Sequence, residues 1–498
     1  MGLGRLFLQD GDVRIALTAV LLAASTVLTA FTVLNLGVYS DDDRPAMAWA
    51  TYTLWALFAL SIWALKGVRG RAVTALVLIG CAVLGAAAMA GPPNTSTDSA
   101  RYAWDGIVQN AGISPYKYVP ADPALAELRT DWLFPAPTVA ADGSESCDGE
   151  RISKTREVGT GEVLCTAINR PQVPTIYPPL AEMLFAGERF FVGPSAEYWP
   201  LQAVGLLFVL GTAALLLRAL RRRALPGWQA ALWAWCPLVL AEGVTNSHVD
   251  LVGAVLILVA TLSVTIGRRA LGGVALGGAI AVKLIPVIAA PALLRRQGWK
   301  VVIAAVATFA VLYIPYILST GIGVLGYLPG YLSEEGYEDG SRFGLISLFA
   351  PGSAALPVAA ILLVVTAVAV IVATDPERPW VAQLVMIGVT LLIVSPRYPW
   401  YALLLVPFIA MSGRWEWFVI GLSILNRQIF PSLAVQRWGI AVSIVVLVAV
   451  SWWRQGPDAP QQLWRGIRRR LPGRRKDVAT GSSGAARTPD VADRPDVA

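Results

Sequence analysis

The sequence has few charged residues for its length. Charged side chains make up 15% of the 498 residues, hydrophobic residues make up 56%, and the mean hydropathy is +0.59. A soluble domain carries about a quarter charged residues, so this composition excludes an ordinary soluble protein. Apolar segments long enough to cross a bilayer recur from end to end, which indicates a polytopic membrane protein.

Metal-ligating residues are also scarce. His248 is the only histidine, and no CxxC or HExxH pattern occurs. Zinc chemistry built by the protein is therefore not expected. The acidic run Asp41–Asp43 lies in a short link without a second set of ligands, and we interpret it as solvated. We expect neither a metal nor a cofactor.

Three further absences narrow the class of protein. The net charge of +7 comes from short basic clusters between apolar runs, which is typical of the positive-inside rule and does not indicate a nucleic-acid partner. No small-residue cleavage site follows the first apolar run, so we expect a retained first span. No internal repeat is evident, which disfavours an inverted-repeat transporter.

The fold class expected is an all-α polytopic bundle of about 12 spans, plus a re-entrant or short-helix pair. The pair is placed at residues 270–294, because Arg268-Arg269 and Arg295-Arg296 flank this run and imply an even number of crossings. Lys283 and Pro286 lie near its middle. The spans are expected at residues 14–38, 47–65, 71–90, 199–217, 228–240, 251–266, 301–318, 354–373, 380–394, 401–411, 417–430 and 434–453.

This arrangement divides the chain into four parts and places both termini in the cytoplasm. Residues 1–71 form an N-terminal hairpin, and residues 72–300 form a core with a long external loop at 91–198. Residues 301–453 form a C-terminal bundle, and the basic tail 454–498 is expected to be disordered. Within the external loop, residues 177–191 are expected to form a helix lying at the membrane interface, because this run carries Glu and Arg residues.

The four cysteines separate into two pairs. Cys81 and Cys236 lie in apolar spans and are interpreted as small core residues. Cys147 and Cys165 both lie in the external loop, where a disulfide would contribute about 3 kcal/mol. Two independent thiols are the alternative.

Polar residues cluster at the external ends of several spans. Asp98, Arg101 and Asp105 follow the third span, His248 and Asp250 lie at a later turn, and Arg397 lies at another. Each has an ordinary explanation: His248 as a helix cap, Arg397 as a snorkelling side chain, and Trp400-Tyr401 as part of an aromatic belt. The acidic loop from Glu334 to Asp339 is interpreted as solvated. However, Asp98, His248 and Arg397 are all expected on the same side of the membrane, and this shared location favours a functional site.

Several motifs in these regions resemble a known family. The motifs are Asp98-x-x-Arg-Tyr-x-Trp-Asp-Gly, Gly112-x-x-Pro-Tyr, Ile176-Tyr-Pro-Pro-Leu180, Asn246-x-His-x-Asp, Lys283-x-x-Pro286 and Ser395-Pro-x-x-Pro-Trp-Tyr. Together they resemble the polyprenyl-phosphate-mannose-dependent mannosyltransferases of the GT-C superfamily, closest to glycosyltransferase family 87 and related bacterial α-mannosyltransferases. The resemblance covers residues 72–408. One departure is that relatives often carry His just before Pro-Trp-Tyr, where this chain has Arg397-Tyr398.

The resemblance implies transfer of mannose, or another hexose, from a polyprenyl-phosphate-sugar donor to an envelope glycolipid or glycan. The transfer would invert the anomeric configuration of the sugar. The reaction would occur at the external face of a bacterial plasma membrane, with membrane lipids as further partners. Asp98 is the expected base, since it lies at the mouth of a span where a polar acceptor meets a lipid-held donor. The rival interpretation is a transporter or flippase of lipid-linked sugars.

The other site residues are assigned in the same terms. The residues expected to support Asp98 are Arg101, Tyr102 and Asp105, although Asp105 would also pair with Arg101. Cations suit a lipid phosphate at membrane depth, and the candidates are Arg397, Lys283 and His248. Aromatic side chains suit the sugar or the lipid chain, and the candidates are Tyr116, Tyr177, Trp400 and Tyr401.

Overall fold

The computed structural model describes residues 2–456, so the predicted tail, residues 454–498, lies almost entirely outside the described residues. Within that range, seven helices are long and apolar enough to cross a membrane, or eight if one bent pair counts as a span. The chain is therefore a multi-pass membrane protein. The expectation of about 12 spans exceeds this number. Three of the expected spans are short helices, because Pro379–Val394 and Pro399–Ser412 fall in the range of 10–17 residues and Phe418–Ile429 has 12 residues, whereas a span needs about 20.

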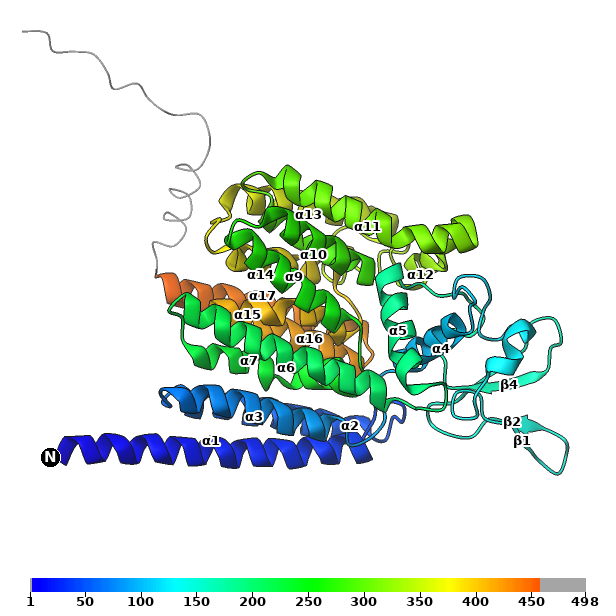
Figure 1. The fold of residues 1–498 in the computed structure, drawn as a ribbon, viewed down its shortest axis with the longest axis horizontal. Helices are drawn as coiled ribbons and strands as arrows, with labels where there is room; N and C mark the ends of the chain where they lie inside the picture. Colours follow the sequence, from blue (N-terminus) through cyan, green and yellow to red (C-terminus); the bar gives the residue numbers. More distant parts are fainter. Residues whose placement is uncertain (1, 457–498) are drawn as a thin grey trace, which may run out of the picture.

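The N-terminal helices lie side by side along one edge of the bundle (Figure 1). They are α1 (Gly2–Asn35), α2 (Arg44–Leu65) and α3 (Arg71–Ala88). In α2, Trp55 and Phe58 pack against Phe418 of α16 (Phe418–Ile429), at ring-centroid distances of 5.3 and 5.6 Å. The hairpin is therefore an integral part of the bundle.

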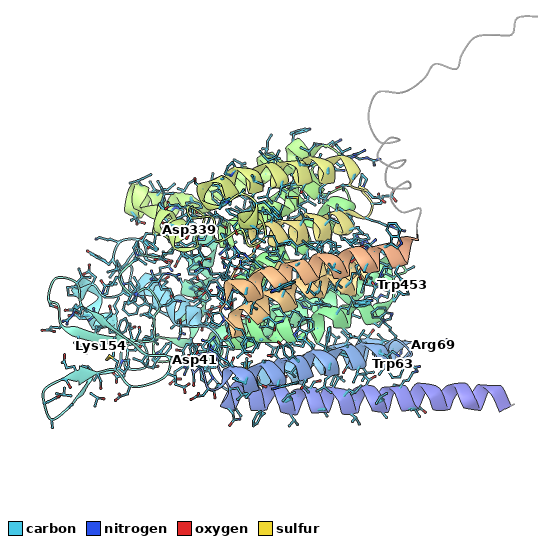
Figure 2. All side chains as sticks on the ribbon, turned by 180° about the vertical axis from the view of Figure 1, so that it is seen from behind. Asp41, Trp63, Arg69, Lys154, Asp339 and Trp453 are labelled. Carbon is cyan, nitrogen blue, oxygen red and sulfur yellow. A yellow bond between two sulfur atoms is a disulfide. The ribbon has the colours of Figure 1, made fainter. Side chains whose placement is uncertain are left out.

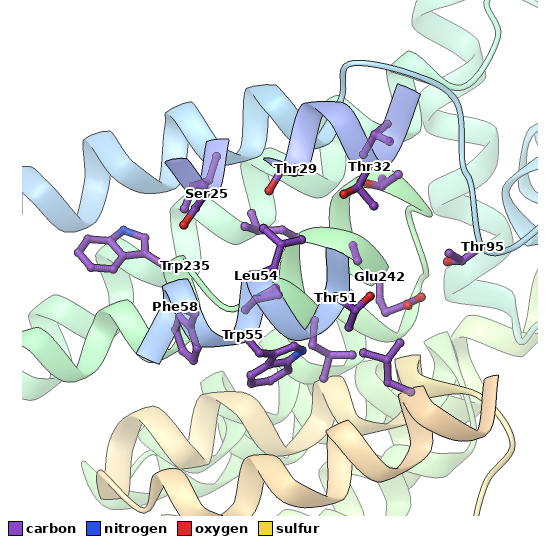
Figure 3. A pocket seen from close by; sticks show the side chains of 18 of the residues that line it. Ser25, Thr29, Thr32, Thr51, Leu54, Trp55, Phe58, Thr95, Trp235 and Glu242 are labelled. Carbon is purple, nitrogen blue, oxygen red and sulfur yellow. The ribbon is translucent and has the colours of Figure 1, made fainter. Parts of the chain in front are cut away.

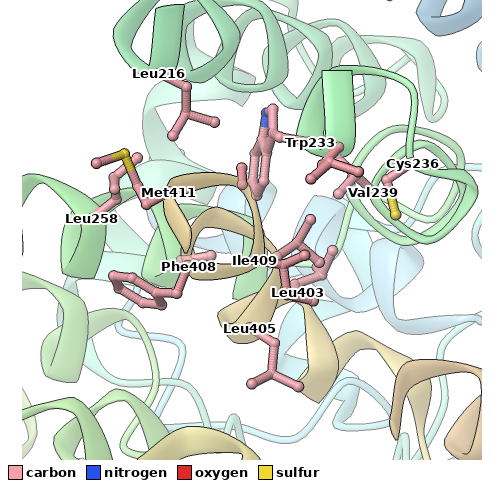
Figure 4. Close-up of a cluster of buried hydrophobic side chains, with 14 of the residues drawn as sticks. Leu216, Trp233, Cys236, Val239, Leu258, Leu403, Leu405, Phe408, Ile409 and Met411 are labelled. Atoms are coloured by element: carbon pink, nitrogen blue, oxygen red, sulfur yellow. The ribbon is translucent and has the colours of Figure 1, made fainter. Parts of the chain in front are cut away.

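The centre of the bundle is formed by broken helices packed against the continuous helix α6 (Trp199–Arg222). The expected span 228–240 is not one helix: a 3-10 turn (Gly227–Ala230), α7 (Ala231–Ala234) and α8 (Pro237–Leu240) replace it. The break falls at Cys236, whose backbone is extended because it precedes Pro237. Trp233 donates its indole N–H to the Val209 carbonyl at 3.0 Å and lies in the core near Phe408 (Figure 4).

A sharp bend follows α8. A π-helical turn (Ala241–Thr245) ends this arm, and α9 (Asp250–Thr265) continues at 118° to it. The sequence predicted two separate spans here and placed the re-entrant pair further along the chain. The bend brings residues 246–249 to the end of the bundle that carries the external loop.

The predicted out-and-back path of residues 270–294 is observed, in a different form. Helix α10 (Arg269–Val282) ends at Lys283, and the chain returns in 3-10 turns at Ile285–Ala289 and Pro291–Leu293 instead of a second half-helix. Pro286 and Pro291 lack the N–H that a regular helix needs. The guanidinium of Arg269 contacts the carbonyl of Arg296, so both basic ends of the segment lie together and Lys283 forms its tip.

The remaining helices complete the bundle. They are α11 (Gly298–Thr320), α12 (Leu328–Glu334), α13 (Ala355–Ala373), α14 (Pro379–Val394), α15 (Val406–Ser412), α16 and α17 (Leu433–Gln455). A 3-10 turn at Pro399–Leu405 precedes α15.

The external loop folds into a small unit of its own, which corrects the expectation of an all-α protein. Besides α4 (Asp98–Asn110) and α5 (Pro179–Val192), it contains two antiparallel pairs, Thr138–Val139 with Glu145–Ser146 (β1, β2) and Ser153–Arg156 with Val163–Thr166 (β3, β4). The predicted Cys147–Cys165 disulfide is confirmed, with a Cα–Cα distance of 5.5 Å.

The two ends of the bundle carry different parts of the chain. Figure 2 shows Lys154, Asp41 and Asp339 at one end and Arg69, Trp63 and Trp453 at the other. In α5, Glu182 and Arg189 are buried in protein contacts instead of facing an interface, while Phe190 and Phe191 are exposed.

Candidate functional site

A cavity of about 740 Å³ opens where the external loop meets the bundle. Five segments surround it: the start of α4, the loop 169–178, the tip of the α10 hairpin, the segment 328–342 and the segment 390–401. This volume lies in the range of small-molecule sites.

Asp98 is the first residue of α4 and lines this cavity. Its N–H donates to the Ser96 hydroxyl at 3.2 Å, and its Oδ1 accepts a hydrogen bond from Asn169 Nδ2 at 2.5 Å. The side chain is 15% exposed. Burial raises the pKa of Asp98, while Lys283 and the Asn169 hydrogen bond oppose that rise. A carboxylate of raised pKa that still reaches a cavity is suited to take a proton.

Arg101 and Asp105 lie on the next turns of α4 and pair with one another. Arg101 Nε lies 2.9 Å from Asp105 Oδ1, and Arg101 Nη1 donates to the Val173 carbonyl at 3.1 Å. Asp105 is buried away from the cavity, whereas Arg101 lines it and leaves Nη2 without a hydrogen-bond partner among the described residues. The pair therefore connects α4 to the loop that carries Asn169.

Lys283 lines the cavity at the hairpin tip. Its Nζ lies 2.7 Å from Asp250 Oδ2 and 4.8 Å from the ring centroid of Tyr401. Asp250 Oδ1 has no hydrogen-bond partner within residues 2–456. The ion pair and the ring hold the ammonium at the wall of the cavity.

One wall of the cavity is apolar and continues to the outer surface of the bundle. Leu284 and Val287 line it and are 36% and 51% exposed. The other residues of this wall are Ile285, Leu328, Leu332, Leu391 and Val394. A hydrocarbon chain can lie along this wall while a polar group attached to it reaches Lys283.

Residues 175–396 match the model of glycosyltransferase family 87. This matched segment (the family 87 region) is similar to a family of glycosyltransferases, and the match specifies neither the sugar nor the acceptor. No curated protein and no solved structure matched the chain. The region includes Lys283, His248 and the apolar wall, while Asp98 lies before it.

His248 of the family 87 region does not line the cavity. Its side chain is buried behind Asp98, with Nδ1 3.6 Å from Asp98 Oδ2, and its ring stacks on Trp400 at 3.9 Å. The structure therefore does not bring His248 into the cavity that holds Lys283. It does not cap α9 either, since no side-chain cap hydrogen bond forms there.

Arg397 also stays outside the cavity. Its neighbours Pro396 and Tyr398 line the cavity, whereas the charge of Arg397 lies near Asp339 and Arg427. Of the three residues expected to bind phosphate (Arg397, Lys283 and His248), only Lys283 lines this cavity.

Two cations that sequence reasoning did not assign to the site line the cavity instead. Arg342 pairs with Glu335 and lies over the Tyr401 ring at 5.7 Å. Arg170 pairs with Glu334 at 2.8 Å and adopts a positive φ of 51°. Two sequence features could have pointed to these residues. Arg170 lies close after Cys165, and Arg342 ends a loop that contains several tyrosines. Neither feature is specific to a binding site.

The aromatic candidates divide in the same way. Tyr177, Trp400 and Tyr401 line the cavity, and Tyr401 Oη lies 2.9 Å from Tyr331 Oη. Tyr116 is buried outside it and donates to the Tyr177 carbonyl at 2.5 Å. Tyr102 is buried and stacks on Phe185 at 4.5 Å.

Within residues 2–456, no group of three His, Cys, Asp or Glu residues is arranged to hold a metal ion.

Proposed function

We propose that this chain transfers mannose, or another hexose, from a polyprenyl-phosphate-sugar to an envelope glycolipid or glycan. The observation that carries the proposal is one cavity in which a carboxylate, cations and an apolar wall meet. Asp98, Lys283 and Leu284 represent these three elements. A phosphate attached to a long hydrocarbon chain fits this combination, and the family 87 match supports a lipid-linked donor.

In this mechanism Asp98 is the general base. The acceptor O–H bond breaks as Asp98 takes the proton, the acceptor oxygen bonds to the anomeric carbon, and the phosphate leaves with the bonding electrons. A single displacement inverts the anomeric configuration, so a β-linked donor mannose gives an α-linkage. No covalent sugar–enzyme intermediate forms.

The leaving phosphate is stabilised by cations that already line the cavity. Lys283 is the principal ligand in this proposal, and Arg342 and Arg170 are its neighbours on the wall. Each of the three is paired with a carboxylate, so each cation is neutralised when no donor is present. Preorganised charge aimed at a leaving group is an effective source of catalysis.

We also infer that the cavity opens on the external face of a plasma membrane. The external loop contains a disulfide, which is typical of oxidising compartments. The basic residues Arg69 and Arg222 lie at the ends of spans away from that loop, as the positive-inside rule expects of cytoplasmic ends.

The test is an assay of membranes that contain the protein, with radiolabelled polyprenyl-phosphate-mannose and acceptor lipid. The expected result is labelled product with wild type and a loss of about 10²–10⁴-fold in rate with Asp98→Asn, which keeps the shape of the side chain. Asp142→Asn, at an exposed carboxylate of the external loop, is the matched control. Near-normal turnover by folded Asp98→Asn would place the base elsewhere.

The rival function is movement of a lipid-linked sugar without transfer. The same membranes distinguish it, because a flippase moves labelled lipid between leaflets and forms no glycosylated product. The family 87 match, to a family of glycosyltransferases, favours transfer over movement alone.

A further inference from the structure

A second pocket, of about 510 Å³, lies at the end of the bundle opposite the catalytic cavity. Trp63 lines it, and Figure 2 shows Trp63 beside Arg69 at that end. The pocket is formed by α2, α7, α16 and α17 together with the 3-10 turns Gly227–Ala230 and Trp415–Trp417. Its apolar lining consists mainly of Phe58, Ile62, Phe418, Val419, Leu422 and Val446.

The pocket exists because α16 is short. Helix α16 has 12 residues and α2 has 22, and the two helices are level at the end near the external loop, where Arg44 Nη1 donates to the Ile429 carbonyl at 2.8 Å. Phe418, the first residue of α16, already packs against Trp55 and Phe58 in the middle of α2. The second half of α2 therefore has no α16 beside it, and the pocket occupies this space.

The depth of the pocket matches one leaflet of a bilayer. Trp55 and Lys66 both line it, and α2 rises about 16 Å between them at about 1.5 Å per residue. The hydrocarbon core of a bilayer is about 30 Å thick, so one leaflet contributes about half of that. Ala59 is exposed and Trp63 is 56% exposed, so the pocket opens to the outer surface of the bundle, where lipid chains lie.

The inner end of the pocket lies at two aromatic rings. Trp55 and Phe58 also line a smaller cavity of about 70 Å³ that reaches Thr29 and Trp235 (Figure 3). An engineered protein cavity that binds benzene measures about 150 Å³, so this smaller one cannot hold a lipid chain. A chain that enters the pocket from the membrane therefore ends at Trp55 and Phe58.

Cations surround the opening of the pocket. Three tryptophans of the lining each have a cation over the ring: Trp63 with Arg14 at 5.3 Å, Trp228 with Lys66 at 4.6 Å, and Trp415 with Arg454 at 6.0 Å. The carboxylate in the lining, Glu416, is buried and pairs with Arg454 at 2.9 Å. Lys66 forms no salt bridge within the part of the chain that the structure describes. The opening therefore carries an excess of positive charge.

We propose that this pocket binds an anionic phospholipid of the leaflet at this end of the bundle, which is the cytoplasmic leaflet in the orientation inferred above. One acyl chain fills the space beside the second half of α2, and the phosphate contacts Lys66, with Arg14 and Arg454 beside it. Basic pockets between membrane helices on the cytoplasmic side are suited to acidic headgroups. The lipid links the N-terminal hairpin to α16 and α17.

The proposal is independent of the sugar-transfer reaction, because the pocket and the catalytic cavity share no residue. A polyprenyl phosphate has the same chemistry, a phosphate on a hydrocarbon chain. The catalytic cavity, where the proposed donor binds, lies at the other end of the bundle, and the depth of the pocket fits an acyl chain of a single leaflet. A phospholipid is therefore the occupant that we assign.

The test is native mass spectrometry of the purified full chain, titrated in detergent with phosphatidylglycerol, phosphatidylcholine or a polyprenyl phosphate. We expect wild type to retain one phosphatidylglycerol more tightly than phosphatidylcholine. Lys66→Gln should weaken the retention of phosphatidylglycerol about fivefold, the effect of one basic residue near an acidic headgroup. Lys300→Gln is the matched control, because Lys300 also lies over a tryptophan, Trp299, at 5.4 Å but lines neither this pocket nor the catalytic cavity.

A second pair of variants tests the chain-binding part of the pocket. Ala59→Phe places a ring in the pocket from an exposed position of α2 and should abolish retention of the phospholipid. Ala56→Phe, the same change at an exposed position of α2 outside the pocket, should bind as wild type does. Neither position is buried, so both variants should fold.

The outcomes are distinguishable. Equal retention of phosphatidylglycerol and phosphatidylcholine, or retention unchanged in both Lys66→Gln and Ala59→Phe, would overturn the proposal. Tighter retention of polyprenyl phosphate that Ala59→Phe abolishes would assign the pocket to the carrier lipid instead. Asp98→Asn should bind phosphatidylglycerol normally, so failure of the proposed sugar transfer leaves this test intact.

Discussion

At the scale of single residues, burial, the charge of Lys283 and the hydrogen bond from Asn169 together set the pKa of the proposed base, Asp98. Burial raises the pKa of Asp98, and the Asn169 amide and Lys283 limit the rise by stabilising the charged form. The base is active when it is deprotonated, so the rate should fall as pH drops through this pKa. Any change that removes a stabilising partner should move that fall to higher pH.

Asn169→Leu is therefore expected to move the acid limb of the pH–rate profile upward by about one to two pH units, since a hydrogen bond to a charged group contributes about 1.5–3 kcal/mol. The measurement is kcat against pH in a detergent or nanodisc preparation. Asn110→Leu, at the end of the helix that begins with Asp98, removes a side-chain hydrogen bond to the Ala186 carbonyl and should leave the limb in place. A downward shift with Asn169→Leu would contradict Asp98 as the titrating base.

A second comparison tests which cation holds the donor phosphate. Lys283→Gln should raise the KM for the lipid donor about tenfold or more, because a charge-assisted contact is lost. Arg397→Gln should change that KM less than about twofold, as Arg397 lies outside the cavity. The reverse ranking in initial-rate measurements would restore Arg397 as the ligand.

Sequence reasoning found the site residues that occur in motifs and missed those defined by contacts. Asp98 and Lys283 were identified because a charged residue at the end of an apolar run is costly without a role. Arg342 and Arg170 carry no such signal, since each lies in or beside a polar loop. Arg397 and His248 were assigned to the phosphate from their charge, their motifs and their common side of the membrane, none of which distinguishes lining a cavity from lying behind it.

At the scale of elements, helices α4 and α5 are joined by a buried polar network. Glu182 of α5 accepts hydrogen bonds from Thr175 at 2.6 Å and Gln109 at 2.9 Å. Burial, and next the charge of Asp105, raise the pKa of Glu182 well above its ordinary value. The folded state therefore holds a proton that the unfolded chain releases at lower pH.

This difference makes the stability of the protein depend on pH. Between the ordinary pKa of Glu and the raised one, the folded state binds more protons, so the free energy of unfolding falls as pH rises. Glu182→Gln removes that dependence. We define the shift as the melting temperature of the variant minus that of wild type, and we expect this shift to be about 2 °C more positive at about pH 8 than at about pH 5.5. Differential scanning fluorimetry measures it, with Glu127→Gln on the surface as the control. An equal difference at both pH values would contradict a protonated Glu182.

Element boundaries were predictable where a helix is long and uninterrupted. Residues 71–90 and 434–453, for example, correspond closely to α3 and α17. Prediction failed at residues 228–240, where Pro237 breaks a continuous apolar run, and at the two small sheets. Strands of two to four residues with exposed side chains have no alternating pattern long enough to recognise.

At the scale of the whole molecule, the basic clusters and the disulfide unit imply one orientation in the membrane. The native cysteines leave a clean background for testing it, because Cys81 and Cys236 are buried and the other two are bonded. Lys117, Glu338 and Arg69 are exposed. Lys117 belongs to the external loop and Glu338 to the segment 328–342 beside the cavity, whereas Arg69 lies at the opposite end of the bundle (Figure 2).

We expect an impermeant thiol reagent to label Lys117→Cys and Glu338→Cys in intact cells and to label Arg69→Cys only after lysis. The readout is a gel shift with a maleimide polymer. Labelling of Arg69→Cys in intact cells would invert the topology and move the proposed reaction to the cytoplasmic face.

The disulfide also bears on when the protein becomes active. Cys165 ends up in strand β4, and the chain runs from this strand directly to Asn169 and Arg170, which reach the catalytic cavity. The bond to Cys147 is a covalent cross-link that restrains this strand in addition to its pairing with β3. On the proposed function, we therefore expect protein in which the bond has not formed to insert into the membrane but to transfer sugar more slowly than the oxidised protein.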